Sequence, residues 1–250
     1  MSVFDAFSLK GHTALVTGSS RGIGRGIAKA FAEAGAKVIV HGTKMTDKLT
    51  SAATECGGLA LAAELGTPGA SEKLIAACRA QNAMPDILVL NASVQDYVKV
   101  EDFTEEEFLR EYRVNVQCSF ELTKLCIPYM RERRWGRILG IGSVNALRPA
   151  PRLSIYATTK AALSNLMQTI ASQYGPDGIT ANTLQPGVIC TDRNEKILSN
   201  QEFSDNLMNM IPARRFGNVN DCAGAALLIC SEAGGYITGA QLPIAGGLDL

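Results

Sequence analysis

The sequence lacks any long basic segment, and its densest group of basic side chains is the short stretch at residues 131–134. Its 24 Lys and Arg residues are matched by 24 Asp and Glu residues. Nucleic acids and anionic membrane surfaces require concentrated positive charge, so neither is expected as a partner, and a small-molecule ligand is. No apolar run approaches the ~18 residues that cross a membrane. The first residues also lack the basic flank and apolar core of a secretory signal.

Histidine is scarce, and the cysteines are not paired in the sequence. His12 and His41 are the only histidines, and neither stands near a Cys or a carboxylate at metal-ligand spacing, which excludes a catalytic zinc site. The seven cysteines form no C-x-x-C pair, so we expect reduced thiols in a cytoplasmic protein. No repeat or linker interrupts residues 1–250, and this length with 46% hydrophobic content predicts a single domain.

A glycine-rich turn separates a short apolar run at residues 13–17 from a helical apolar pattern at 22–34. Glycines let the backbone turn tightly and approach a pyrophosphate, while the N–H groups at the start of a helix meet its negative charge. The spacing differs from G-x-G-x-x-G but serves the same purpose. We therefore expect a dinucleotide to be bound by Gly18, Ser20, Arg21, Gly22, Ile23 and Gly24.

The residues after the second expected strand, 36–40, favour NADP(H) over NAD(H). An acidic residue there would bind the ribose 2′-hydroxyl of NAD, whereas basic groups accept the 2′-phosphate of NADP. The strand instead runs into His41, Gly42, Thr43 and Lys44. Arg21 and Lys44 would attract the phosphate, and Thr43 would donate a hydrogen bond. The alternative is that Arg21 is a solvated loop charge and that Lys44 merely opens the next helix.

Strands and helices alternate along the rest of the chain. Further strands are expected at 59–63, 86–90, 138–141, 179–184 and within 236–247, and helices at 70–80, 104–130 and 154–174. This alternation predicts an α/β fold, a Rossmann-type doubly wound domain with a seven-stranded, mostly parallel sheet and helices on both faces. Ligands bind at the carboxyl ends of such strands, where Glu64, Leu65, Asn91 and Ala92 stand. Glu64 would meet the adenine and Asn91 the adjoining ribose, although either could equally stabilise its loop.

Tyr156 and Lys160 stand four residues apart in the helix expected at 154–174, so their side chains should share one helix face. A neighbouring ammonium favours phenolate over phenol, and so lowers the tyrosine pKa toward the range of proton transfer at neutral pH. Taken alone, the pair could equally cover a helix surface.

Two further segments carry open alternatives. Asn115 lies in the middle of the helix expected at 104–130, which Thr104 and Glu107 would cap. A buried Asn needs hydrogen-bond partners, so it could serve the structure or a proton relay. Residues 192–215 are polar and irregular, and could form a mobile lid over the substrate or a helical excursion.

The order and spacing of these motifs resemble the classical short-chain dehydrogenase/reductase family over essentially the whole chain. The matching positions are Thr17 to Gly24, Asn91, Ala92, Asn115, Ser143, Tyr156, Lys160, and Pro186-Gly187 leading to Thr191. The resemblance implies that Tyr156 is the general acid/base, that Ser143 holds the substrate oxygen, and that Lys160 binds the nicotinamide ribose and lowers the tyrosine pKa. It also implies a relay water on Asn115. Implied nicotinamide contacts are Pro186, Gly187, Ile189 and Thr191, and implied substrate contacts are Ser143, Asn145, Tyr156 and Val188.

Two positions depart from the family pattern. Ser93 follows Asn91 and Ala92 where the family has a glycine that lets the backbone lie close to the cofactor. Glu64 and Leu65 stand after the third strand, where an Asp followed by Val or Leu is usual.

The resemblance implies an NADP(H)-dependent oxidoreductase that interconverts a secondary alcohol and a ketone. Arg148 and Arg152 lie between Ser143 and Tyr156 and suit a carboxylate-bearing or polyhydroxylated substrate, unless they are rim charges. Residues 4–11 resemble members that act on sugars, sugar acids and polyols.

The main rival is a 3-oxoacyl-[acyl-carrier-protein] reductase, which needs a basic entrance that Arg134 matches and Asp177 does not. A non-enzymatic alternative is a catalytically silent dinucleotide-binding sensor or scaffold. The intact Ser143, Tyr156 and Lys160 argue against this alternative. Relatives form tetramers through the two long helices, so a homotetramer is expected, with a dimer as the alternative.

Overall fold

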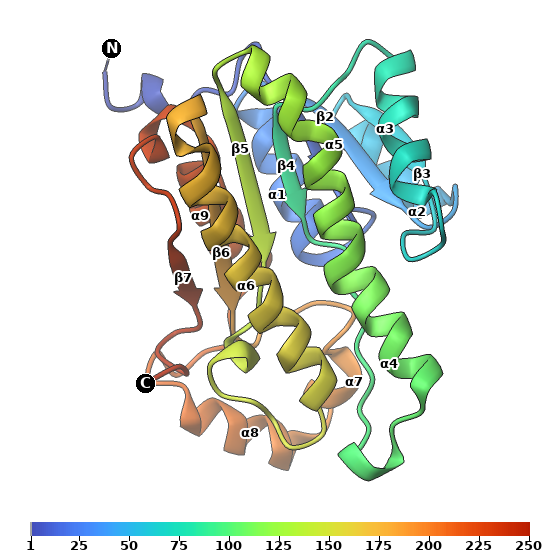
Figure 1. Ribbon diagram of the computed structural model, residues 1–250. Coiled ribbons are helices and arrows are strands. Elements are labelled where there is room, and N and C mark those ends of the chain that lie inside the picture. Colours follow the sequence, from blue (N-terminus) through green and yellow to red (C-terminus); the bar gives the residue numbers. More distant parts are fainter. Residues whose placement is uncertain (1) are drawn as a thin grey trace.

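A computed structural model describes residues 2–250, and its central element is a seven-stranded sheet with helices on both faces (Figure 1). The strand order is β3-β2-β1-β4-β5-β6-β7, and every neighbouring pair is parallel. The predicted doubly wound α/β fold is therefore confirmed. The strands are β1 (Thr13–Val16), β2 (Lys37–Gly42), β3 (Leu59–Ala62), β4 (Ile87–Leu90), β5 (Gly136–Ile141), β6 (Ile179–Pro186) and β7 (Gln241–Ile244).

The helices include those expected at 70–80 and 154–174, but also two that the periodicity did not predict, α2 and α9. Both begin at polar caps, since the Thr46 side chain accepts the Leu49 N–H, and Asn218 forms a capping box with Asp221. The helices are α1 (Gly22–Glu33), α2 (Asp47–Glu55), α3 (Ala70–Ala80), α4 (Glu105–Tyr112), α5 (Cys118–Glu132), α6 (Ser154–Tyr174), α7 (Glu195–Leu198), α8 (Gln201–Met210) and α9 (Val219–Cys230).

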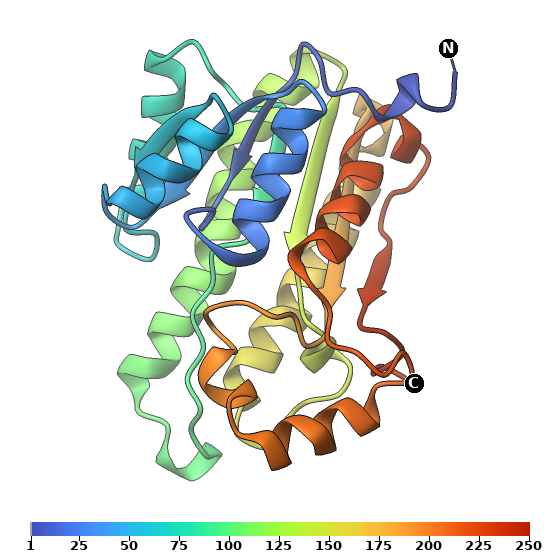
Figure 2. The same ribbon diagram turned by 180° about the vertical axis from the view of Figure 1, so that it is seen from behind.

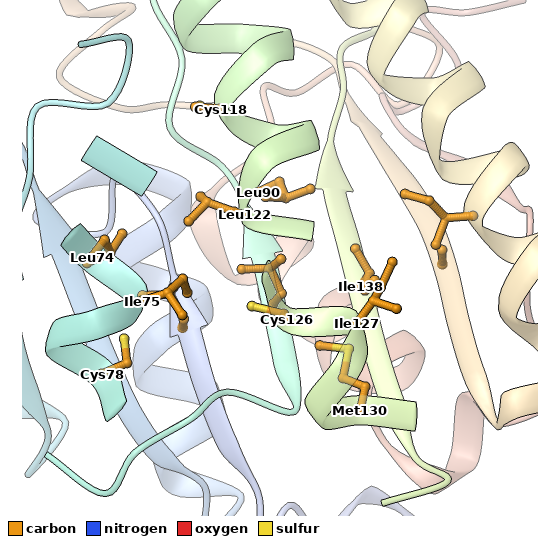
Figure 3. Close-up of a cluster of buried hydrophobic side chains, with 14 of the residues drawn as sticks. Leu74, Ile75, Cys78, Leu90, Cys118, Leu122, Cys126, Ile127, Met130 and Ile138 are labelled. Carbon is orange, nitrogen blue, oxygen red and sulfur yellow. The ribbon is translucent and has the colours of Figure 1, made fainter. Parts of the chain in front are cut away.

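Side chains of the strands alternate between two apolar layers, as the two-residue period of a strand requires. Leu15 and Leu88 join the layer under α3, α5 and α6, whereas Val16 and Val89 join the layer under α1, α2 and α9. Figures 1 and 2 show these helix sets on opposite faces of the sheet. The first layer is drawn in Figure 3, with labelled side chains Leu74, Ile75, Cys78, Leu90, Cys118, Leu122, Cys126, Ile127, Met130 and Ile138.

The long helix expected at 104–130 is present as a continuous helical stretch from Glu105 to Glu132, but its middle is not α-helical. Thr104 and Glu107 do form a capping box at its start, but a π-helical segment, Arg113–Gln117, separates α4 from α5. Asn115 lies in this segment, and its amide bonds to the loop after β4 rather than remaining within the helix surface. Such π segments are frequent at functional sites because they redirect one side chain.

The carboxyl edge of the sheet collects the segments that the sequence singled out. The chain leaves β1 toward β2 and later returns at β4 on the other side, so the turns after β1 and β4 meet at a topological switch point. Helices α7 and α8 cross the same end of the molecule (Figures 1 and 2). The segment 192–215 is helical over Glu195–Leu198 and Gln201–Met210 rather than irregular throughout.

Candidate active site

The glycine turn after β1 is held against the loop after β4. Gly18 has a φ of +63°, and a Cβ there would lie 2.9 Å from the Ala92 Cα, so a larger residue would be strained and crowded. A Cβ on Gly24 would overlap the Asn91 amide. That amide donates to the carbonyl oxygens of Thr17 at 2.8 Å and Gly18 at 3.0 Å. Asn91 therefore positions the turn.

His41 supports the same turn as a neutral side chain. Its Nδ1 accepts the Gly18 N–H at 3.2 Å, and its Nε2 donates to the Ala63 carbonyl oxygen at 3.0 Å. Burial lowers the pKa of His41 to about 4, because the charged ring would lose its hydration. His41 thus orients the turn without contributing a positive charge to the cofactor region.

A cavity of about 1020 Å³ runs from the glycine turn to Tyr156. Most of the residues that the sequence assigned to cofactor and substrate line it: Gly18, Ser20, Arg21, Gly22, Ile23, His41, Gly42, Thr43, Glu64, Leu65, Asn91, Ala92, Ser143, Asn145, Tyr156, Lys160, Pro186, Gly187, Val188, Ile189 and Thr191. Three assigned residues lie outside this lining. Lys44 is exposed to solvent outside the cavity, while Gly24 and Asn115 are buried and do not reach the cavity surface.

Ser143 follows β5 and is fixed by the loop that succeeds it. Its hydroxyl oxygen accepts the Asn145 backbone N–H at 3.1 Å and the Asn145 amide at 3.3 Å. The Asn145 side-chain oxygen accepts the Ala150 N–H at 3.2 Å, which ties the wall of the cavity to the serine. With both nearby nitrogens donating to it, the Ser143 oxygen is left to donate its own hydrogen toward Tyr156, with which it is hydrogen-bonded.

Tyr156 and Lys160 project from one face of α6, as their spacing predicts, and both are buried. The Lys160 Nζ lies 5.5 Å from the Tyr156 ring centre and donates to the Ile141 carbonyl oxygen at 2.7 Å. Burial lowers the pKa of Lys160 to about 7, and the Arg193 charge acts in the same direction. A lysine that is only partly protonated near neutral pH can exchange a proton with its surroundings.

We expected Lys160 to lower the pKa of Tyr156, but in the protein without ligands the pKa of Tyr156 is raised. Burial raises the pKa of Tyr156, and the strongest opposing influence is the positive charge of Arg193, followed by the hydrogen bond from Ser143. A phenol removed from water resists ionisation. The phenol of Tyr156 therefore stays protonated at neutral pH in the protein alone.

Asn115 joins the loop after β4 to helix α6, which carries Tyr156 and Lys160. Its amide nitrogen donates to the Val94 carbonyl oxygen at 2.9 Å and to the Thr159 hydroxyl at 3.0 Å, while its oxygen accepts the Val94 N–H at 2.9 Å. Both N–H groups of the amide are thus occupied by protein partners. Asn115 fixes the loop after β4 relative to α6.

The structure reveals two charged residues that the sequence reasoning missed. Glu111, one turn before Asn115, is fully buried, and its Oε1 accepts the Asp96 N–H at 2.5 Å. Arg193, in the segment before α7, donates to the hydroxyl and carbonyl oxygens of Ser93 at 3.1 and 2.8 Å. Its proximity to Ser93 could not be read from the sequence, because the two residues are 100 positions apart.

The two arginines considered for the substrate have other positions. Arg148 lines the cavity, but its Nη1 donates to the carbonyl oxygens of Leu248 at 2.6 Å and Leu250 at 2.8 Å. Arg152 is exposed and does not line the cavity. Arg148 therefore anchors the segment after β7 against the loop that follows Ser143.

Within residues 2–250, no group of three or more His, Cys, Asp or Glu side chains is arranged to hold a metal ion.

None of the helices in the described part of the chain is both long and apolar enough to span a bilayer.

Comparisons with known proteins agree with this site. A family model described as enoyl-(acyl carrier protein) reductase matches residues 18–249. The 2-dehydro-3-deoxy-D-gluconate 5-dehydrogenase of Bacillus subtilis (strain 168) is 37% identical over 97% of this chain and 96% of its own. A gluconate 5-dehydrogenase structure from Burkholderia cenocepacia J2315, in complex with NADP and tartrate, superposes with a TM-score of 0.92 at 31% identity, covering 99% and 98% of the two chains.

A third similar protein carries the name of the rival activity. The structure of a 3-oxoacyl (acyl-carrier-protein) reductase from Agrobacterium tumefaciens C58 with NADP bound has a TM-score of 0.93 at 38% identity, and covers 99% of this chain and 98% of its own. All these matches extend over nearly the whole chain and include the motifs at the carboxyl edge of the sheet. The chain belongs to the classical short-chain dehydrogenase/reductase family of NAD(P)(H)-dependent oxidoreductases.

Proposed function

We propose that this protein is an NADP(H)-dependent oxidoreductase that interconverts a secondary alcohol and a ketone on a small sugar, sugar acid or polyol. The observation that carries the proposal is the shared cavity, which has the glycine turn at one end and Ser143, Tyr156 and Lys160 at the other. Similar proteins named as dehydrogenases of gluconate and of 2-dehydro-3-deoxy-D-gluconate support the substrate class.

The residues present fit a dinucleotide. Gly18 and Gly24 let the glycine turn pack closely against the loop after β4, and helix α1 begins at Gly22, which lines the cavity, so its free N–H groups can meet a pyrophosphate there. In this proposal Glu64 and Leu65 contact the adenine, and Ile189 and Thr191 contact the nicotinamide; all four line the cavity. When bound, the nicotinamide supplies or accepts the hydride.

The remaining chemistry is proton transfer, which falls to Tyr156. In the reducing direction its hydroxyl donates the proton to the carbonyl oxygen as negative charge develops there. Ser143 donates a hydrogen bond at the same position and holds the oxygen in place. Lys160, with a pKa of about 7, stabilises the phenolate that results and returns a proton to it.

In this proposal Arg21, which lines the cavity beside the glycine turn, binds the 2′-phosphate of NADP. It lies 4.0 Å from the Asp192 carboxylate, which Lys48 also approaches at 3.5 Å, and all three side chains are solvent-accessible. We expect Arg21→Ser to raise the KM for NADP(H) about tenfold, because one charge-assisted contact is lost. The KM for NAD(H), which lacks the phosphate, should stay within about twofold.

Steady-state kinetics with both cofactors measure this preference. Lys29→Ala is the matched control, since Lys29 is an exposed cation of α1 that pairs with Glu33 away from the cavity. An equal rise in KM for NADP(H) and NAD(H) in Arg21→Ser would contradict a phosphate contact.

The acyl-carrier-protein reductase is the second candidate, favoured by the Agrobacterium tumefaciens match. An acidic carrier protein needs unpaired basic groups on the surface it meets. Asp177 pairs with Arg131 at 3.0 Å and with Arg134 at 3.5 Å, so the basic stretch that the sequence offered is partly neutralised. This pairing favours a small free substrate over a carrier-linked one.

A sensor or scaffold without catalysis is the candidate from another class. It would have no use for a buried phenol hydrogen-bonded to Ser143 and a buried lysine at the nicotinamide end of the cavity. Burying Lys160 also costs free energy, because its ammonium group loses hydration. A protein that only binds the dinucleotide would gain nothing from this burial.

A substrate panel distinguishes these candidates. Cofactor absorbance is followed with sugar acids, neutral sugars, polyols and a carrier-linked 3-oxoacyl thioester, in both directions and with both cofactors. We expect saturable, NADP(H)-preferring turnover of sugar-type substrates. Turnover of the thioester alone would establish the reductase, and cofactor binding without any turnover would support the sensor.

A homotetramer is part of the proposal, with a dimer as the alternative. Phe108, Leu109 and Phe120 are exposed apolar side chains of α4 and α5, and Phe120 is 53% exposed. A shallow apolar depression between these helices and Leu166 of α6 would suit a second copy of the chain. A cytoplasmic location is also proposed, since all seven cysteines are free thiols and five of them are buried.

A further inference from the structure

Five arginines of the described part of the chain line the cavity, namely Arg21, Arg110, Arg113, Arg148 and Arg193. Arg110, Arg148 and Arg193 differ in their partners. Arg110 forms an ion pair with Asp96. Arg148 is engaged by the carbonyl oxygens of Leu248 and Leu250. Arg193 donates only to the neutral oxygens of Ser93, and among residues 2–250 no carboxylate lies within ion-pair distance of it. Its positive charge therefore lacks a counter-ion from the protein.

The position of Arg193 is set by the loop after β4. Ser93 is the residue that replaces the family glycine, and its hydroxyl accepts one of the two hydrogen bonds from the guanidinium. The next residue, Val94, is held from both its N–H and its carbonyl oxygen by Asn115. The guanidinium is thus oriented by a braced loop, although it belongs to a segment before α7 that crosses the cavity.

Arg193 retains hydrogen-bond donors for a ligand. A guanidinium has five N–H donors, and the two bonds to Ser93 use one each on Nη1 and Nη2. The remaining donors can bind a carboxylate in the bidentate geometry for which arginine is suited. Arg193, Tyr156 and Lys160 line the same cavity, so one small substrate can contact both the guanidinium and the Tyr156 hydroxyl.

We propose that Arg193 binds the carboxylate of the substrate and that the preferred substrates are therefore hydroxy acids and keto acids of the sugar type rather than neutral sugars or polyols. This inference rests on the proposed function and narrows its substrate class. Ser93 acts as a positioning residue, because it holds the guanidinium without itself reaching the reacting atoms.

The test compares gluconate with glucitol, a matched pair that differs in a carboxylate against a hydroxymethyl group. In the wild-type protein we expect a lower KM for gluconate. Arg193→Met, which keeps much of the side-chain volume but removes the charge, should raise the KM for gluconate roughly 30-fold. It should leave the KM for glucitol within about threefold, and Arg193→Lys should be intermediate since it retains charge without the fork.

Two controls make the result specific. Arg152→Met removes an exposed arginine of the neighbouring loop that does not line the cavity, and it should change neither KM. The Kd for NADP(H), measured by calorimetry, should be unchanged in Arg193→Met. A weaker Kd would mean that Arg193 binds the cofactor diphosphate, and an equal rise in both substrate KM values would mean that it only shapes the segment; either result overturns the inference.

The inference and the proposed function fail in different ways. If the wild-type protein turns over glucitol and gluconate with equal KM, the proposed function stands and the role of Arg193 is refuted. If it turns over neither these nor any other sugar-type substrate, both are refuted together.

Discussion

Replacing Tyr156 with phenylalanine is expected to lower kcat about 10³-fold, because the only change is the loss of the proton donor at the substrate oxygen. Tyr156 is 7% exposed and hydrogen-bonded to Ser143. The phenyl ring keeps the packing of α6, and Lys160 keeps its bond to the Ile141 carbonyl oxygen. The Kd for NADP(H) should therefore stay within about threefold, while turnover is measured by cofactor absorbance on the best substrate of the panel.

Tyr112→Phe is the matched control for this substitution. Its hydroxyl donates to Thr158 at 3.4 Å on the outer side of α4 and α6, and Tyr112 does not line the catalytic cavity. We expect its kcat to stay within about twofold, and thermal unfolding should be similar for both variants and the wild type. Near-normal turnover by Tyr156→Phe would refute the assignment of the general acid/base.

Sequence reasoning succeeded where a residue acts close to its own position in the chain. Gly18 was assigned to a tight turn, and its φ of +63° requires that conformational freedom. The spacing of Tyr156 and Lys160 was sufficient to place them on one face of α6. The parallel sheet is predicted by short apolar runs that alternate with helical patterns, because a strand buried on both faces reads as a continuous apolar run.

Sequence reasoning failed where a side chain reaches across the fold. Arg148 stands between Ser143 and Tyr156, which suggested a substrate contact, but it anchors Leu248. Arg193 gave no signal, because its partner Ser93 meets it only through the tertiary structure. Helix α9 was missed because its residues are almost all apolar, so its periodicity has little contrast even though Asn218 and Asp221 mark its start.

Glu111 shows the same limit in a different way. It follows three acidic residues of α4, Glu105 to Glu107, and a helix rich in acids is expected to face water. The structure instead buries it at 0% exposure, and its Oε2 has no hydrogen-bond partner among residues 2–250. Burial raises the pKa of Glu111 to about 7; the Asp96 N–H and Arg110 oppose this rise, and the Asp96 charge adds to it.

This raised pKa makes the stability of the fold depend on pH in a defined direction. Below the ordinary value of 4.5, the folded and unfolded chains both carry the proton, and the buried carboxyl is neutral. Between 4.5 and about 7 the unfolded chain loses its proton while the folded protein retains it, so stability falls as the pH rises. Above that range the folded protein must bear a buried charge, at a cost of up to about 3 kcal/mol.

Glu111→Gln removes this titration, and we expect it to gain up to about 3 kcal/mol relative to the wild type between pH 4.5 and pH 8. Urea unfolding of both proteins at several pH values measures how the difference in their free energies of unfolding changes with pH. Any effect of the amide on packing that does not depend on pH cancels in this comparison. Glu105→Gln is the matched control, because Glu105 is an exposed acid of the same helix, and its curve should run within about 0.5 kcal/mol of parallel to the wild type. Parallel curves for Glu111→Gln would show that the carboxyl ionises normally.

The negative charge of Glu111 also raises the pKa values of Tyr156 and Lys160, so Glu111→Gln should also shift the pH profile of turnover to lower pH.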